Sequence, residues 1–338
     1  MPGWWLTPRA GAVGGALASL IGWPLPWMVG SLLAIILLRC LGGLDLREVP
    51  GARKGGQWLV GTGIGLHFSP AVLEQVLAHG GLLLAGALLT SLTSLIGIAL
   101  LRAAGHDRAT AFFASMPGGA SEMVNLGQRN GAQAGEVAAG QSLRLLLVVL
   151  LVPALFQWWL GAAPALAQTH GHSQPLALAA LLAGGALLAL LGQRLRQPNP
   201  WLLGPILFAA AGAIWLDQPL SLPPGTSELG QWLIGSALGC HFSREFFRRA
   251  PRFLVLVLGA TLLGMCAAAL AAEALGWLGA LDQRSLMLGM MPGGIAELSL
   301  TAEALALSVP LITGLQVLRL MCVLFLAEPA FRLWQRQR

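Results

Sequence analysis

The stretch MPGGASEMVNLGQRNGAQAGEVAAGQSLR, residues 116–144, has a partner in MPGGIAELSLTAEALALSVPLITGLQVLR, residues 291–319. Both open with Met-Pro-Gly-Gly and place a glutamate five residues after the proline. Both close with Gln-x-x-Arg at the start of an apolar run. Proline removes a backbone donor and two glycines permit positive φ, so each Pro-Gly-Gly predicts a break in a helix.

These two stretches belong to a duplication of the whole chain. PWMVG at 26–30 returns as PWLLG at 200–204, and QWLVGTGIGLHFS at 57–69 returns as QWLIGSALGCHFS at 231–243. Such self-similarity at a fixed offset is the signature of an internal repeat. We predict repeat 1 over residues 1–160, a linker over 161–175 and repeat 2 over 176–338.

The composition is that of a membrane protein. Apolar residues make up 56% of the chain and charged residues 10%, against about 25% charged in soluble domains. We expect an all-α polytopic membrane protein with about five transmembrane helices and one re-entrant broken-helix hairpin in each repeat. The predicted apolar stretches are 10–22, 26–38, 56–68, 80–101, 136–160, 176–192, 200–216, 229–242, 253–275 and 308–331.

Lysine and arginine predict the orientation in the membrane, because they concentrate on the cytoplasmic side. With the linker outside and five crossings per repeat, 17 of the 20 basic residues fall inside; the others are Arg144, Arg284 and Arg319. Both termini are then cytoplasmic. Five is an odd number of crossings, so the two repeats run in opposite directions, an inverted topology typical of secondary transporters.

The net charge of +6 therefore indicates cytoplasmic loops, and no basic block is long enough to read nucleic acid. The four cysteines form no CxxC or CxH pattern, so we expect no metal or cofactor. The expected partners are a small-molecule or ion substrate and the lipid bilayer, and a homo-oligomer is left open.

The candidate site lies at the two predicted breaks. The helix-break residues are Pro117, Gly118, Gly119, Pro292, Gly293 and Gly294. The candidate substrate- or ion-binding residues are Ser121, Glu122, Asn125, Gln141, Arg144, Glu297, Gln316 and Arg319. Each half-helix, starting near Ser121 or Ala296, would point a partly positive N-terminus into a cavity. An ordinary loop outside the membrane is the alternative.

The charged candidates admit two interpretations each. A buried Glu122 or Glu297 could exchange a proton, bind a cation or hold a substrate amine, or could serve only the structure. Arg144 and Arg319 could clamp an anionic substrate, or could pair with those glutamates. Gln141 and Gln316 lie one helical turn from the arginines on the same face.

MPGGASEM with QSLR, MPGGIAELSLTAEAL with QVLRL, and the QWLVG and QWLIG elements resemble the bacterial AbrB-type membrane-protein family over both repeats. Its members are labelled ammonia monooxygenase or regulator of gene expression. The resemblance implies a multi-pass protein of the bacterial inner membrane. Six scattered histidines do not suit a copper or iron oxygenase, so we expect no enzyme. We predict a secondary transporter, with a membrane sensor that acts on gene expression indirectly as the alternative.

Overall fold

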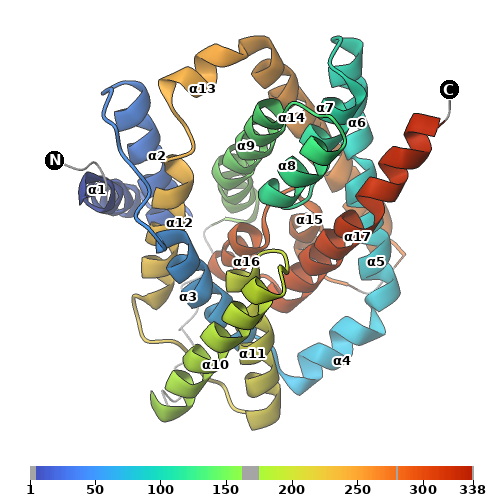
Figure 1. Cartoon of the computed structure of the whole chain (residues 1–338). Coiled ribbons are helices and arrows are strands. Elements are labelled where there is room, and N and C mark those ends of the chain that lie inside the picture. Colours follow the sequence, from blue (N-terminus) through green and yellow to red (C-terminus); the bar gives the residue numbers. More distant parts are fainter. Residues whose placement is uncertain (1–4, 162–174, 279–280, 337–338) are drawn as a thin grey trace. The chain divides into compact units, whose positions relative to one another are not determined.

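The computed structural model describes residues 5–161, 175–278 and 281–336 (Figure 1). The predicted linker, 161–175, lies almost entirely outside these residues. The described part of the chain contains helices and no strands, which confirms the all-α prediction. The helices are α1 (Leu6–Leu20), α2 (Pro26–Cys40), α3 (Ala52–Leu66), α4 (Pro70–Ala78), α5 (Gly80–Leu92), α6 (Ser94–Ala103), α7 (Arg108–Ser115), α8 (Ala120–Arg129), α9 (Ala134–Leu160), α10 (Pro175–Arg194), α11 (Pro200–Leu216), α12 (Thr226–Gly239), α13 (Arg244–Arg249), α14 (Pro251–Gly276), α15 (Gln283–Met290), α16 (Ile295–Ala304) and α17 (Val309–Arg336).

Five apolar segments are long enough to cross a bilayer: α5 with α6, α9, α10, α14 and α17. Each holds at least 20 residues, and about 20 residues of helix span the hydrocarbon core. Two further apolar helices, α2 and α11, are shorter. The chain is thus a polytopic membrane protein. The predicted ten crossings and the inverted orientation stay predictions.

The helices follow the duplication in the sequence. Helices α2 and α11 start 174 residues apart, at Pro26 and Pro200. Helices α7 and α15 start 175 residues apart, at Arg108 and Gln283, as do α8 and α16. Equivalent sequence has therefore formed equivalent helices in both halves.

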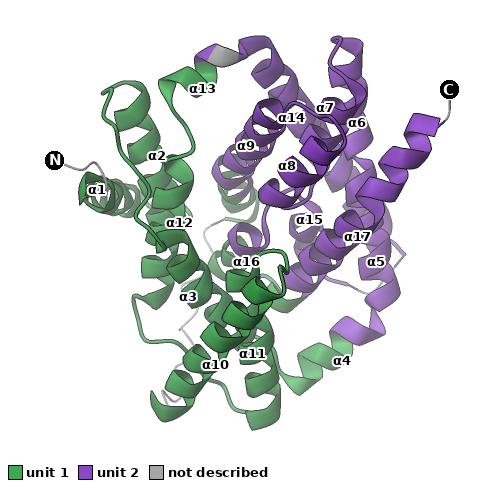
Figure 2. Cartoon of the chain, in the orientation of Figure 1, with its two compact units in different colours: residues 1–75, 153–247, 299–310 green, residues 76–152, 248–298, 311–338 purple. Residues whose placement is uncertain are grey.

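The chain forms two compact units that differ from the sequence repeats (Figure 2). Unit 1 comprises residues 1–75, 153–247 and 299–310, and unit 2 comprises residues 76–152, 248–298 and 311–338. Each unit takes segments from both halves of the chain. The predicted boundaries at 160 and 176 remain an assignment of the sequence repeat.

Unit 1 packs its helices in pairs that match under exchange of the halves. Helix α1 packs against α2 as α10 packs against α11, and α3 packs against α11 as α12 packs against α2. The side chains of Trp58 and Trp232 repeat this relation: their Nε1 groups donate to the carbonyls of Leu182 and Pro8, at 2.9 and 3.2 Å. The four residues pair at the same offset of 174.

Glycines allow these helices to approach closely. A Cβ on Gly61 would lie 2.7 Å from the carbonyl oxygen of Leu202, and one on Gly65 would lie 2.7 Å from that of Ile206. In the other half, a Cβ on Gly235 would overlap the carbonyl oxygen of Met28. Small residues at helix interfaces are the usual means of packing helices in membranes.

We expect Gly61→Ala to lower the free energy of unfolding by roughly 1–3 kcal/mol, since the added methyl meets backbone that cannot turn aside. Gly55→Ala, on the same helix, is the control. Its Cβ would meet only a side-chain atom of Leu233 at 3.9 Å. It should stabilise the helix by up to about 1 kcal/mol. Thermal melting in detergent measures both variants, and equal melting temperatures would contradict the close packing of α3 on α11.

Unit 2 holds both helix breaks. Helix α14 packs against α5, α6 and α15, while α7 packs against α6 and α8. One buried apolar cluster joins five of its helices, α5, α14, α15, α17 and the segment before α15. Its largest members include Leu83, Leu275, Leu286, Met290 and Leu315.

Candidate functional site

Each Met-Pro-Gly-Gly stretch separates two short helices of unit 2. Asp107 and Asp282 cap the first helix of each pair, accepting hydrogen bonds from the backbone of Thr110 (2.7 Å) and Ser285 (3.0 Å). The first helix stops at a methionine with extended backbone, because the following proline disfavours the helical conformation there. The second helix starts at Ala120 or Ile295, one residue before the predicted position.

In the first break, Gln141 and Arg144 of α9 hold the carbonyl groups that the interrupted helix leaves without partners. The amide of Gln141 donates to the carbonyls of Phe113 and Met116, each at 2.9 Å. The guanidinium of Arg144 donates to the carbonyls of Met116 (2.9 Å) and Gly118 (3.3 Å). Arg144 also donates to Oε1 of Gln141 at 2.9 Å. The two side chains thus fix the end of α7.

The second break has the same arrangement. The amide of Gln316 donates to the carbonyls of Gly289 (2.5 Å) and Met291 (3.2 Å). The guanidinium of Arg319 donates to those of Met291 (2.8 Å) and Gly293 (2.5 Å). Arg144 is 6% exposed and Arg319 4% exposed. Carbonyls at a helix C-terminus carry partial negative charge, so they stabilise these buried cations.

The glutamates lie at the start of the second helix of each pair. Glu122 and Glu297 are the third helical residues of α8 and α16, the position from which a glutamate folds back toward the helix N-terminus. Their carboxylates occupy the space that a Cβ would take at Gly119 and Gly294. No ion pair joins Glu122 to Arg144 in the part of the chain that the structure describes.

One element of the sequence interpretation is wrong. We expected the glycines of the breaks to adopt positive φ, but none of the four does. Gly119 has φ −65° and ψ 136°, a conformation open to most residues. The glycine is needed because of the carboxylate lying against its Cα. At Gly118, a Cβ would be 2.7 Å from the side chain of Met123. Close approach is therefore the reason for both glycines.

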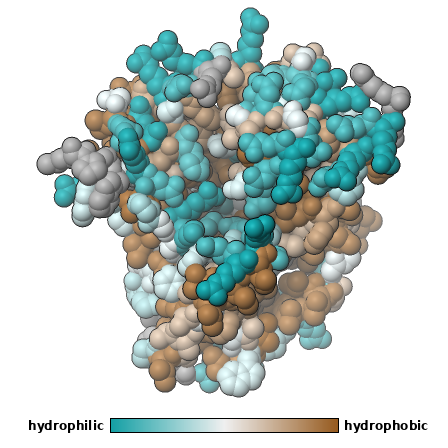
Figure 3. Space-filling view, in the orientation of Figure 1, coloured by the Kyte–Doolittle hydropathy of each residue, from teal (hydrophilic) through white to brown (hydrophobic). Residues whose placement is uncertain are grey.

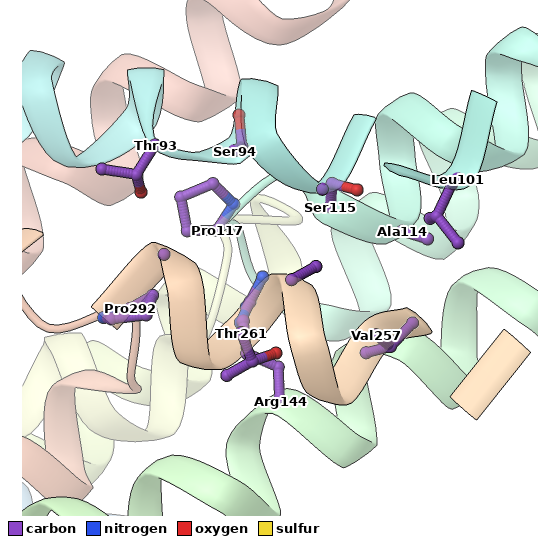
Figure 4. A pocket seen from close by; sticks show the side chains of 13 residues that line it. Thr93, Ser94, Leu101, Ala114, Ser115, Pro117, Arg144, Val257, Thr261 and Pro292 are labelled. Atoms are coloured by element: carbon purple, nitrogen blue, oxygen red, sulfur yellow. The ribbon is translucent and has the colours of Figure 1, made fainter. Parts of the chain in front are cut away.

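Both breaks line one cavity of unit 2, which we call the break cavity (Figure 4). Its volume is about 40 Å³, room for one small ion or a few waters. Pro117 and Pro292 lie on its wall, together with the buried Arg144. The Nε of Arg144 has no hydrogen-bond partner. The remaining lining residues are Thr93, Ser94, Gly97, Leu101, Ala114, Ser115, Val257, Ala260, Thr261 and Gly264.

The break cavity includes hydroxyl groups that the sequence analysis missed. Thr93 and Ser94 lie between α5 and α6, where their hydroxyls donate to the carbonyls of Thr90 (2.7 Å) and Ser91 (2.6 Å). Such bonds compete with the regular helix and often bend it. The signal was the run TSLTS, residues 90–94, inside an otherwise apolar span. Ser115 and Thr261 had no comparable signal.

The other predicted residues lie outside the break cavity. Ser121 and Asn125 are exposed on one face of α8, and Glu122 is half-buried beside Gly119. Gln141 lies next to Arg144 but is fully buried against backbone. Arg319 and Gln316 contact the second break only. Within the described ranges, no group of three or more His, Cys, Asp or Glu residues could hold a metal ion.

Comparison with known proteins agrees with this architecture. The family model described as "Transition state regulatory protein AbrB" matches residues 27–335. The chain belongs to the AbrB family. A Bacillus subtilis (strain 168) protein named "Uncharacterized protein YhjN" is 28% identical, with 95% of this chain and 90% of that protein aligned. An Escherichia coli (strain K12) protein of the AbrB family, named "Putative regulator AbrB", is 30% identical over 91% of this chain and 89% of its own length.

Proposed function

We propose that this member of the AbrB family is a secondary transporter of a small anion, with its site at the break cavity. The observation that carries the proposal is that both Pro-Gly-Gly breaks line one cavity beside a buried arginine. Broken helices beside a cavity are how many transporters bind solutes within the membrane, since irregular backbone is tolerated there.

The charge of the site favours an anion. Arg144 bonds to carbonyls and an amide and has no carboxylate partner in the described residues. Its Nε atom is buried and unpaired. The cavity adds the side chains of Thr93, Ser94, Ser115 and Thr261, whose hydroxyl groups can donate to an anion. Its volume suits one small ion, so we propose an inorganic anion or a short carboxylate.

Glu122 has a separate role in this proposal. A carboxylate against the N-terminus of α8 can gain and lose a proton as the helix moves, which would couple anion movement to a proton gradient. The proposal places the protein in the bacterial inner membrane with both termini cytoplasmic. It assigns the protein no enzymatic activity and no nucleic-acid partner.

The test is charge movement in proteoliposomes, recorded on a solid-supported membrane with a panel of small anions. We expect a current for at least one anion, and its loss in Ser115→Leu, which fills the cavity. Ser19→Leu adds the same side chain at an exposed position of α1 and should retain the current.

The relatives' printed names favour a second candidate, a regulator that senses a small molecule. Equilibrium binding on the same samples separates the two. An anion that binds the wild type, fails to bind Ser115→Leu and yields no current or counterflow would identify a sensor. Absence of both binding and current across the panel would contradict an anion site.

A further inference from the structure

Unit 2 carries a second, larger hollow that the proposed transport site does not use. We call it the leucine groove. It has a volume of about 770 Å³ and lies between the span formed by α5 and α6 and the outer half of α17. Its lining residues are Leu88, Ser91, Leu92, Ser94, Leu95, Ile98, Ala99, Arg102, Arg108, Phe112, Met116, Cys322, Val323, Leu326, Ala327, Ala330 and Trp334.

The walls of the leucine groove are apolar and open to the outside of unit 2. Leu92 is 55% exposed, Leu95 57% and Leu326 52%. The surface over α5 and the adjoining part of α17 is hydrophobic in Figure 3, and the C-terminal end of α17 is hydrophilic. An apolar face of this kind on a membrane-spanning segment adjoins acyl chains.

One end of the leucine groove is basic. Arg102 closes α6 and Arg108 opens α7, and the guanidinium of Arg108 lies 5.3 Å from the ring centre of Trp334. Arg102 donates one hydrogen bond, to the carbonyl of His106 at 2.7 Å. In the described residues no carboxylate pairs with either arginine. The nearby acids already have partners: Glu136 lies 3.0 Å from His106, and Glu328 lies 2.5 Å from Arg332.

We propose that the leucine groove binds the acyl chain of an anionic phospholipid, whose phosphate is held by Arg102 and Arg108. From Leu88 to Arg102 the helix rises by about 21 Å. The hydrocarbon of one leaflet is about 15 Å deep, so the groove can follow a chain to its headgroup. Two unpaired cations beside a tryptophan match a lipid phosphate at the interface, where basic pockets between helices bind anionic headgroups.

Charge separates this occupant from others. A second copy of the chain would have to bring carboxylates to two arginines in a protein with a net charge of +6. A neutral lipid would fill the apolar part but would leave the arginines without a net counter-charge. The predicted topology also puts both arginines on the cytoplasmic side, where the surface of the bilayer is negative.

The test is native mass spectrometry of the purified, delipidated protein after titration with dioleoyl phosphatidylglycerol or dioleoyl phosphatidylcholine. We expect the wild type to retain phosphatidylglycerol at lower concentrations than phosphatidylcholine. Arg102→Gln/Arg108→Gln should weaken retention of phosphatidylglycerol roughly 30-fold, because each basic residue at an anionic lipid contributes a factor of roughly five. Arg194→Gln/Arg196→Gln removes the same charge from exposed positions of unit 1 and should change retention little.

A second variant tests the groove itself without altering its charge. Ala99 is exposed in the leucine groove, so Ala99→Trp should block the acyl chain and lower retention of phosphatidylglycerol at least tenfold. Ala179→Trp, at an exposed position of α10, should have no effect. Equal retention of the two lipids by the wild type, or unchanged retention in Ala99→Trp, would overturn the proposal. So would a dimer that Ala99→Trp converts to monomer, because a second copy would then occupy the groove.

Discussion

Arg144→Gln should lower the free energy of unfolding by roughly 3 kcal/mol. The variant loses hydrogen bonds to Met116 and Gly118, and each bond from a charged donor contributes roughly 1.5–3 kcal/mol. The relief of burying a charge offsets part of that loss. Arg319→Gln should behave alike, since its bonds to Met291 and Gly293 are the counterparts in the second break.

The informative comparison is with Glu122. If Arg144 and Glu122 formed a buried ion pair, removing both charges would recover much of the stability lost by removing one. Because Arg144 is held by backbone carbonyls instead, we expect Glu122→Gln/Arg144→Gln to equal the sum of the two single losses within about 0.5 kcal/mol.

Thermal melting in detergent, followed by tryptophan fluorescence, measures these variants. Arg129→Gln is the matched control, since it removes an exposed arginine from the same hairpin and should cost less than about 0.5 kcal/mol. Arg144→Lys should not restore stability, because an ammonium cannot bridge two carbonyls in the fixed geometry of a guanidinium. A double variant more stable than Arg144→Gln alone would contradict this account of the break.

The second large effect is expected on activity. Gly119→Ala places a methyl group where the Glu122 carboxylate lies, so the glutamate must swing away from the start of α8. The backbone at Gly119 suits alanine, so the fold should survive. We expect anion-driven current in proteoliposomes to fall at least tenfold, as it should in Glu122→Ala. The melting temperature should change little, because the cost of a lost helix cap is only about 1 kcal/mol.

Gly135→Ala supplies the control for this experiment. It lies in the first turn of α9, where an added Cβ would meet nothing within 4 Å. Its current should match the wild type, with a slight gain in stability. Full current in Gly119→Ala beside an inactive Glu122→Ala would show that the glutamate acts from another position. A large fall in melting temperature would show instead that Glu122 holds the break together.

Much of the fold could be predicted because its signals are local. Apolar runs bounded by proline, glycine and charged residues placed α9 at 136–160 and α17 at 308–331, and the structure has Ala134–Leu160 and Val309–Arg336. The start of α8 was predicted within one residue, since Pro-Gly-Gly prevents a helix from continuing. The offset of 175 residues then placed α16 in the second half.

The partners of the charged groups could not be predicted in the same way. Sequence analysis offered Glu122 as a partner for Arg144, because carboxylates are visible in a sequence. The groups that Arg144 actually contacts are the carbonyls of Met116 and Gly118. Every residue has a carbonyl, so a sequence cannot show which ones a broken helix leaves unpaired. That depends on how α9 packs beside the break.

By itself, the sequence determined an all-α membrane protein, its duplication, its two helix breaks and the side chains that accompany them. Only the tertiary structure decided that Pro117 and Pro292 share a cavity, and that Thr93 and Thr261 line it. It also decided that each compact unit takes segments from both repeats. Helix positions follow from neighbouring residues along the chain, whereas cavities and units arise where the packing of side chains brings distant segments together.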